Sequence, residues 1–189
     1  MFSDKKIILA SQSPRRSQLL REAGFEFEVR AKEVEETYPD SLKVEDVAAY
    51  LAQKKAKASS ELLDNQTIIL AADSVVIIDD TIYNKPTDYA DGVRMLQALS
   101  GRMHRVITGV CLLSEEKELV FSGISNVFLD VITDEEIDFY LNAYQPYDKA
   151  GAYGVQEWLG LCKINKIEGT YANVMGLPVQ LVYQHLINF

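Results

Sequence analysis

The chain has 189 residues, of which 48% are hydrophobic and 25% are charged, and its formal net charge is -9. This composition is typical of a soluble globular protein, and the acidic balance argues against a general nucleic-acid-binding protein, which needs a broad basic face. No apolar run approaches the roughly 20 residues of a membrane span, so we expect neither a nucleic-acid nor a membrane partner. The N-terminal residues show no signal-peptide pattern. Cys111 and Cys162 have no CxxC spacing and are too few for a disulfide framework, which favours a reducing cytoplasm.

Strand and helix patterns alternate along the chain, which predicts an α/β fold. Strands are expected at residues 6–10, 25–29, 67–79 and 119–132, with another after a turn at Ser100-Gly101. Helices are expected at 14–23 and 44–63, from a Thr87 N-cap to about Leu99, after a capping box at 133–136, and after 176–178. A loop is expected at 31–43, a turn at 82–89, and loop with short strands at 146–176. No repeat or linker is found, so residues 1–189 are predicted to form a single domain.

The first predicted helix begins with two arginines. Ser13 suits the N-cap and Pro14 the first helical position, which places Arg15 and Arg16 in the first turn. That turn carries partial positive charge and favours acidic residues. A bound phosphate would remove the conflict, because helix N–H groups and two guanidinium groups would then meet one anion. The alternative is a solvated surface pair or a set of salt bridges.

The helix predicted at 44–63 carries a lysine within its apolar stripe. Lys55 falls close to the centre of the stripe, Lys54 lies at its edge and Lys57 points away. A lysine in that position either extends its ammonium group to solvent or meets an anion.

An aspartate interrupts the apolar run at 67–79. Asp73 either forms the corner of a turn between two shorter strands, or lies at the end of a strand as a metal ligand or general base facing the cationic residues. Lys85 follows in the turn Asn84-Lys85-Pro86, where it is either a surface lysine or a further cation of the same site. His104 and His185 have no second histidine or cysteine partner, so a zinc site is not expected.

These features occur in one ordered set of motifs. The segments are LASQSPRR (9–16), Glu35-Glu36, QKKA (53–56), AADS (71–74), NKP (84–86), SGRMHRVITGV (100–110), DKAGAYGVQ (148–156) and IEGTYANVMGLPV (167–179). Together they resemble the Maf family of nucleoside triphosphate pyrophosphatases, from Leu9 to Val179. The resemblance implies a fold related to inosine triphosphate pyrophosphatases: a mixed twisted sheet flanked by helices, with two lobes around a cleft.

The resemblance also implies a cytoplasmic hydrolase that cleaves a nucleoside triphosphate to the monophosphate and pyrophosphate with Mg²⁺ or Mn²⁺. Its motifs assign phosphate binding to Ser13, Arg15 and Arg16. Asp73 matches the position of the proton acceptor. The other catalytic positions match Glu36, Lys55 and Lys85, and the expected metal ligands are Glu36 and Asp73. A homodimer is compatible with the resemblance and with exposed strand edges.

Within the family, Arg15 and Gln156 resemble the branch that hydrolyses dTTP and UTP, and modified pyrimidine nucleotides are compatible with it. Ser74 replaces the threonine usual there, and Glu157-Trp158-Leu159 replaces a small glycine-rich turn, so Arg15, Ser74 and Gln156 are the candidate specificity residues. One alternative is a pyrophosphatase for 7-methyl-GTP or another modified nucleotide. An alternative of another class is a regulator of cell division that binds a nucleotide but does not hydrolyse it.

Overall fold

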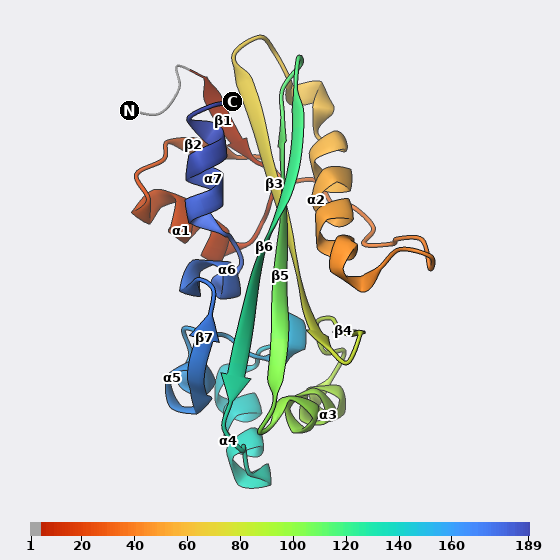
Figure 1. Ribbon diagram of the computed structural model, residues 1–189, viewed down its shortest axis with the longest axis vertical. Coiled ribbons are helices and arrows are strands. Elements are labelled where there is room, and N and C mark those ends of the chain that lie inside the picture. The colour runs from red at the N-terminus through yellow and green to blue at the C-terminus, as the bar shows by residue number, and fades with distance from the viewer. Residues whose placement is uncertain (1–4) are drawn as a thin grey trace. The chain divides into compact units, whose positions relative to one another are not determined.

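The computed structural model describes residues 5–189 (Figure 1). The strands of this part of the chain are β1 (Lys6–Leu9), β2 (Phe27–Val29), β3 (Thr67–Ile78), β4 (Thr81–Tyr83), β5 (Met103–Leu113), β6 (Glu118–Leu129) and β7 (Ile164–Glu168). The α-helices are α1 (Pro14–Glu22), α2 (Val47–Lys57), α3 (Tyr89–Leu99), α4 (Asp134–Tyr144), α5 (Trp158–Lys163), α6 (Tyr171–Met175) and α7 (Val179–Leu186).

The strands form a mixed sheet in the order β2-β1-β3-β5-β6-β7, with β4 paired to β3. β1 runs parallel to both β2 and β3, whereas the β3–β4 and β6–β7 pairs are antiparallel. The predicted fold class, a mixed α/β sheet flanked by helices, is therefore confirmed. The cleft between two lobes stays a prediction.

The chain divides into two compact units. The first comprises residues 1–73, 108–123 and 176–189, and the second comprises 74–107 and 124–175. The boundaries fall inside β3, β5 and β6, so each unit is built from separate stretches of the sequence. The prediction of a single domain over 1–189 stays a prediction.

In the first unit, residues on β1 and β3 alternate between the two faces of the sheet. Ile8 of β1 is paired with Ile69 of β3, and both pack with Ala52 and Ala56 of α2 and with Cys111. The intervening side chains point to the other face, as the period of two residues in a strand requires. Figure 1 shows α2 on one side of these strands and α1 and α7 on the other. A parallel pair covered on both faces explains why β1 and β3 are almost continuously apolar.

Helix α2 is shorter than the predicted helix at 44–63. Residues Val44–Asp46 and Ser60–Leu62 form separate 3₁₀ turns, and the α-helix ends at Lys57. The serines at 59 and 60 explain the break, because serine side chains compete for backbone hydrogen bonds and favour turns.

A glycine on β5 allows α2 to approach the sheet closely. A Cβ added at Gly109 would lie 2.3 Å from the carbonyl carbon of Ala48 and from the nitrogen of Ala49. Any side chain at this position would therefore push the helix backbone away. Gly109 fixes the height of α2 above the sheet, and with it the position of the lysines at the helix end.

The second unit has its own apolar core, formed where α3 and α4 pack together with Tyr140 fully buried between them and the strands. The N-cap of α3 is Asp88, whose side chain accepts from the Asp91 N–H, so the prediction of Thr87 as the cap is wrong. The predicted capping box of α4 is confirmed in both directions between Thr133 and Glu136.

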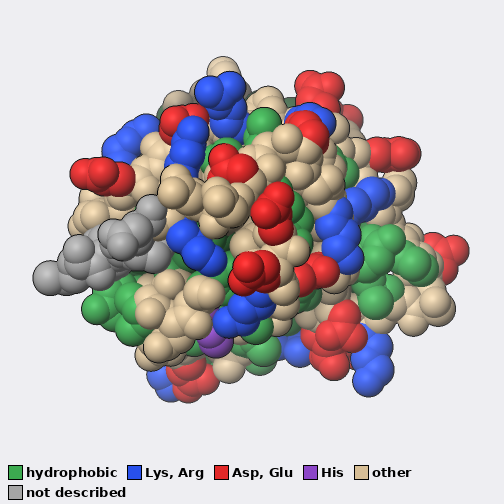
Figure 2. Space-filling view, turned by 90° about the horizontal axis from the view of Figure 1, so that it is seen from above, with side chains coloured by type: hydrophobic (Ala, Val, Ile, Leu, Met, Phe, Trp, Pro, Cys, Tyr) green, Lys and Arg blue, Asp and Glu red, His purple; other side chains and the backbone are tan. Residues whose placement is uncertain are grey.

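The expectation of loop and short strands at 146–176 is wrong in part, because α5 and α6 lie in this region. They have six and five residues, which is too short for a helical period to be recognised in the sequence. Among the described residues, no helix has the length and apolar character needed to cross a membrane. Figure 2 shows basic and acidic side chains interspersed on one face of the described part of the molecule.

Candidate active site

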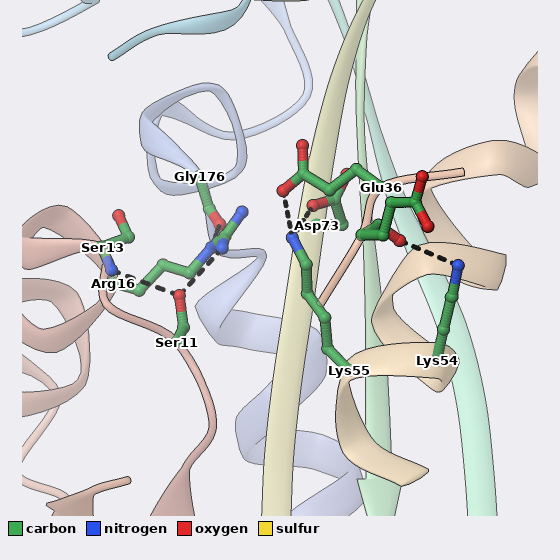
Figure 3. A network of polar contacts seen from close by, with 9 residues as sticks. Ser11, Ser13, Arg16, Glu36, Lys54, Lys55, Asp73 and Gly176 are labelled. Atoms are coloured by element: carbon green, nitrogen blue, oxygen red, sulfur yellow. Dashed lines mark hydrogen bonds and ion pairs between the residues drawn. The ribbon is translucent and has the colours of Figure 1, made fainter. Parts of the chain in front are cut away.

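The turn between β1 and α1 holds one arginine firmly in place. Ser13 occupies the N-cap position of α1 and Pro14 the first turn, as predicted, although the Ser13 side chain makes no capping hydrogen bond. Arg16 Nε donates to the Gly176 carbonyl oxygen at 2.8 Å, and its Nη1 donates to Ser11 Oγ at 3.0 Å (Figure 3). Ser11 Oγ also accepts from the Ser13 N–H at 3.3 Å. The guanidinium group is thus fixed beside the start of a helix, which is a favourable place for an anion.

The charges around Arg16 show which side chains share its surroundings. Burial is the main cause that lowers the pKa of the Arg16 guanidinium group, and the neighbouring charge of Arg15 lowers it further. The carboxylates of Asp73 and Glu36 act in the opposite direction and raise this pKa. Arg16 therefore interacts with a second cation and with two carboxylates.

At the centre of the candidate site, one lysine bridges two carboxylates. Lys55 Nζ lies 2.5 Å from Asp73 Oδ1 and 2.7 Å from Glu36 Oε1 (Figure 3). The side chains of Asp73 and Lys55 are only 10% and 17% exposed, whereas that of Glu36 is 47% exposed. The ammonium group thus compensates the charge of Asp73 where solvent does so poorly.

The strand pattern explains how this pair forms. Asp73 lies in the middle of the continuous strand β3, so neither the interpretation as a turn between two shorter strands nor the expected place at a strand end is correct. Counting in twos along the strand places Asp73 on the same face as Ile69 and Ala71, which pack under α2. Lys55 comes from that helix and meets the carboxylate directly, so of the two outcomes considered for it, the meeting with an anion is confirmed.

The loop between β2 and α2 carries Glu36, and Lys54 holds this loop. Lys54 Nζ donates to the Glu35 carbonyl oxygen at 2.8 Å, to the Thr37 carbonyl oxygen at 3.1 Å and to Thr37 Oγ1 at 2.9 Å. The sequence pattern did not single out Lys54, Ser11 or the Gly176 carbonyl group. Lys54 bonds to a loop, while Ser11 and the Gly176 carbonyl group bond to Arg16, and no residue pattern reveals these contacts.

The remaining predicted site residues belong to the second unit. Ser74 follows Asp73 in β3, Lys85 is exposed in the loop after β4, and Gln156 lies just before α5. The structure therefore brings together the predicted residues of the first unit, and the place of these three in the same site stays a prediction.

The turn that carries Gln156 is held by a buried polar network. Lys149 Nζ lies 2.9 Å from Glu157 Oε1, and the Tyr140 hydroxyl donates to Glu157 Oε2. The Gly154 N–H in turn donates to the Tyr140 oxygen at 3.0 Å, so both ends of the turn are attached to one tyrosine. The side-chain oxygen of Gln156 is buried and has no hydrogen-bond partner in the protein. A buried amide oxygen of this kind is ready to accept a hydrogen bond from a ligand.

The two histidines lie apart from these groups. His104 Nε2 and the Tyr153 hydroxyl are 2.6 Å apart in the core of the second unit, and burial lowers the pKa of His104 to about 4. His185 packs against Phe121 in the first unit.

Two solved structures show a partial likeness to this fold. A nucleoside-triphosphatase, also described as a dITP/XTP pyrophosphatase, from Mycobacterium abscessus is 22% identical and matches with a TM-score of 0.41 over 67% of this chain and 74% of its own. The Ham1 protein of Staphylococcus aureus is 17% identical and matches with a TM-score of 0.46 over 66% of this chain and 72% of its own.

Sequence relatives match almost the whole chain. Proteins from Porphyromonas gingivalis, Phocaeicola vulgatus and Flavobacterium psychrophilum are 49%, 46% and 44% identical to it, and each is named dTTP/UTP pyrophosphatase. The matches cover 97%, 96% and 99% of this chain and 94%, 94% and 96% of the relatives. The family model described as Maf-like protein matches residues 6–189. The chain therefore belongs to the Maf family.

Proposed function

We propose that this protein is a nucleoside triphosphate pyrophosphatase that hydrolyses dTTP and UTP to the monophosphate and pyrophosphate. The observation that carries the proposal is the buried Lys55–Asp73 pair, with Glu36 on the same ammonium group and Arg16 of α1 interacting with both carboxylates. A site that merely binds a polyanion gains nothing from two carboxylates beside its cations, whereas a hydrolase needs a proton acceptor there. The names of the relatives, which are 44–49% identical, support the same reaction.

The cations are assigned to the triphosphate. Arg15 and Arg16 would bind it together with the N–H groups at the start of α1, next to Ser13. Lys55 and Lys85 would neutralise the charge that develops on the departing pyrophosphate. Phosphoryl transfer is accelerated mainly by such positioning and charge stabilisation, because the protein takes little part in the covalent chemistry.

Asp73 is assigned as the proton acceptor. A water molecule attacks the α-phosphorus and forms a new P–O bond, while its proton passes to an Asp73 carboxylate oxygen. The bond from the α-phosphorus to the bridging oxygen breaks, and its electron pair leaves with pyrophosphate. The strand fixes this carboxylate, and the bond from Lys55 orients it until the nucleotide binds.

The carboxylates also fit a divalent metal ion. Asp73 and Glu36 both reach one ammonium nitrogen, so both can reach one cation, and their oxygens are the donors that Mg²⁺ and Mn²⁺ prefer. Two protein ligands leave the other positions to phosphate oxygens and water, the usual arrangement for Mg²⁺ at nucleotides. When bound, the ion would supply further neutralisation of phosphate charge. Lys55 would then pass from the carboxylates to the phosphates.

Base selectivity is assigned to Arg15, Ser74 and Gln156. A glutamine amide donates to a keto oxygen and accepts from a ring N–H, a pair of groups that uracil and thymine both present. The unpartnered, buried oxygen of Gln156 supports this role. Ser74 keeps the hydroxyl of threonine without its methyl group, so we expect looser selection among pyrimidines than threonine would give.

We also propose that the protein acts in the cytoplasm. Both cysteines are free thiols, with Cys111 buried and Cys162 exposed, which suits a reducing compartment. The homodimer suggested by the family resemblance stays a prediction.

The experiment that tests the function measures pyrophosphate release from dTTP, UTP, CTP, dATP, GTP and 7-methyl-GTP with Mg²⁺ or Mn²⁺, beside the variant Asp73→Asn. We expect selective turnover of dTTP and UTP, and a loss of about 10²–10⁴-fold in the variant, the usual contribution of a general base. Circular dichroism of the variant should be unchanged. Turnover of 7-methyl-GTP instead would reject the roles of Arg15 and Gln156. Tight nucleotide binding without any turnover would favour the regulator over the enzyme.

A further inference from the structure

Glu36 belongs to a segment that has little regular structure of its own. It lies in the long connection from the end of β2 at Val29 to the first turn at Val44. The Arg30 N–H donates to the Leu9 carbonyl oxygen at one end, and the Leu42 N–H donates to the Pro39 carbonyl oxygen near the other. A connection of this length has many conformations, so holding one carboxylate of it in a defined place requires a contact from outside the loop.

Lys54 supplies that contact on both sides of Glu36. Its ammonium nitrogen has three donors, and the structure places three loop acceptors around it, at 2.8, 2.9 and 3.1 Å. One acceptor belongs to the residue before Glu36 and the other two belong to the residue after it. The backbone is therefore fixed immediately before and after the carboxylate. Figure 3 shows Lys54 and Lys55 on the same helix, close to Glu36.

The two consecutive lysines at the end of α2 thus have different partners. Successive residues of a helix point about 100° apart, so Lys55 reaches the strand carboxylate while Lys54 reaches the loop. Lys55 makes ion pairs with Asp73 and Glu36, whereas the three bonds of Lys54 go to neutral oxygens of Glu35 and Thr37. Lys54 therefore does not compete with Lys55 for the carboxylates.

We propose that Lys54 is a positioning residue for the reaction: it fixes the loop on either side of Glu36 and so holds the Glu36 carboxylate against Lys55 and Asp73. The role of Glu36 in turnover rests on the proposed function, whereas the attachment of the loop does not. Residues that orient a functional carboxylate typically change activity by about 10–100-fold when they are removed.

The test compares Lys54→Met, which keeps most of the stem but removes the donors, with Lys54→Arg and with Lys57→Met. Lys57 is a matched control because it lies on the same helix, is 54% exposed and has its ammonium nitrogen 3.2 Å from Glu118 Oε1. We expect Lys54→Met to lower kcat/KM for dTTP by about 10–100-fold, Lys54→Arg to recover part of this loss, and Lys57→Met to leave kcat/KM unchanged.

Two further measurements separate positioning from a general structural effect. Backbone order parameters from nitrogen-15 relaxation should fall at residues 35–37 of Lys54→Met, from about 0.85 toward values below about 0.6, with no change elsewhere in α2. In a protein that already carries Glu36→Gln, adding Lys54→Met should cause no further loss of activity. The effects of the two substitutions are not additive if both act through the Glu36 carboxylate.

The proposal is overturned if the order parameters at 35–37 do not change, or if the loss from Lys54→Met is equally large in the Glu36→Gln background. If the wild-type protein turns over no nucleotide, the proposed function fails. The order parameters then decide by themselves whether Lys54 holds the loop.

Discussion

Lys55 Nζ lies 2.5 Å from Asp73 Oδ1, across 18 positions of sequence, and this pair joins the end of α2 to the middle of β3. Each residue is unfavourable in its own element, since a lysine interrupts an apolar helix face and an aspartate interrupts an apolar strand. Together they compensate each other, and they leave a carboxylate and an ammonium group where a phosphate or a metal ion could exchange partners with them. The next prediction depends on that exchange.

Replacing Lys55 with Met should abolish most activity and also reduce stability. The Asp73 carboxylate would remain almost buried without its ammonium partner, which should cost about 3–5 kcal/mol in free energy of unfolding. Loss of a cation that stabilises the departing pyrophosphate should lower kcat by at least about 10²-fold. Urea unfolding and pyrophosphate release measure the two effects. Equal stability of Lys55→Met and the exposed variant Lys57→Met would contradict the importance of the buried pair.

The sequence predicts the site residues of the first unit better than it predicts the contacts that hold them. Arg16, Lys55 and Asp73 were recognisable because each carries charge where its local pattern demands something else. Lys54 and Ser11 could not be recognised in this way, because a lysine at the edge of an apolar helix face and a serine in a turn are both common. Lys54 bonds to the loop around Glu36, and Ser11 bonds to the Arg16 guanidinium group. Only the fold brings these partners together.

The helices and strands show the same difference between features with a local sequence signal and features without one. The strands β1, β2, β3, β5 and β6, helix α1 and the α4 capping box agree with the prediction, since their signals lie within consecutive residues. The short strand β4 lies partly where a turn was expected, so that expectation is wrong there. The prediction lacks the break in α2 after Lys57, because the serines that favour it follow an apolar helical period that continues past them in the sequence. It lacks α5 and α6 because they are too short to show a helical period. Asp88 rather than Thr87 caps α3, a choice between two neighbouring residues that both suit an N-cap.

Replacing Gly109 with Ala should move α2 and reduce both stability and activity. Its Cβ would approach the backbone of Ala48 and Ala49 to 2.3 Å, and a helix backbone cannot rotate away as a side chain can. Overpacking of this kind costs about 1–3 kcal/mol. We expect kcat/KM to fall as well, because Lys54 and Lys55 would shift with the helix.

Gly92→Ala is the matched control for Gly109→Ala. The Cβ added at Gly92 would meet only the end of the Leu141 side chain, at 3.0 Å, and alanine favours the surrounding helix α3 by about 1 kcal/mol. Its stability should therefore stay near that of the wild type. If thermal unfolding shows Gly109→Ala to be as stable as Gly92→Ala, the close contact between α2 and β5 is not as described.

Acid should destabilise the protein in part through His104. Burial lowers the pKa of this histidine in the folded protein from 6.5 to about 4, so between these values the unfolded chain binds a proton that the folded protein does not. Stability should therefore fall as the pH falls from about 6.5 to about 4, and the contribution of this one group amounts to about 3 kcal/mol at the lower end.

The variant His104→Gln tests this assignment, because glutamine can still bond to the Tyr153 hydroxyl but does not titrate. Urea unfolding at pH 7, 5.5 and 4.5 should show a smaller loss of stability with acid in the variant than in the wild type. Parallel pH dependences for the two proteins would assign the acid sensitivity to other groups.

Replacing Glu157 with Gln should destabilise the second unit strongly. The side chains of Lys149 and Glu157 are only 10% and 17% exposed, so the variant leaves a nearly buried ammonium group whose remaining carboxylate partner, Asp148, is 58% exposed. Breaking a buried ion pair from one side costs about 3–5 kcal/mol, and the bond to Asp148 should offset part of that. By contrast, Asp148→Asn removes the exposed partner of the same lysine and should cost less than about 1 kcal/mol. Chemical denaturation of the two variants measures the difference, and similar losses in both would show that Glu157 is not the main partner of Lys149.

Because Glu157 follows Gln156 directly, the destabilised variant Glu157→Gln should also discriminate less between dTTP and CTP. Pyrophosphate release from the two nucleotides would detect this change.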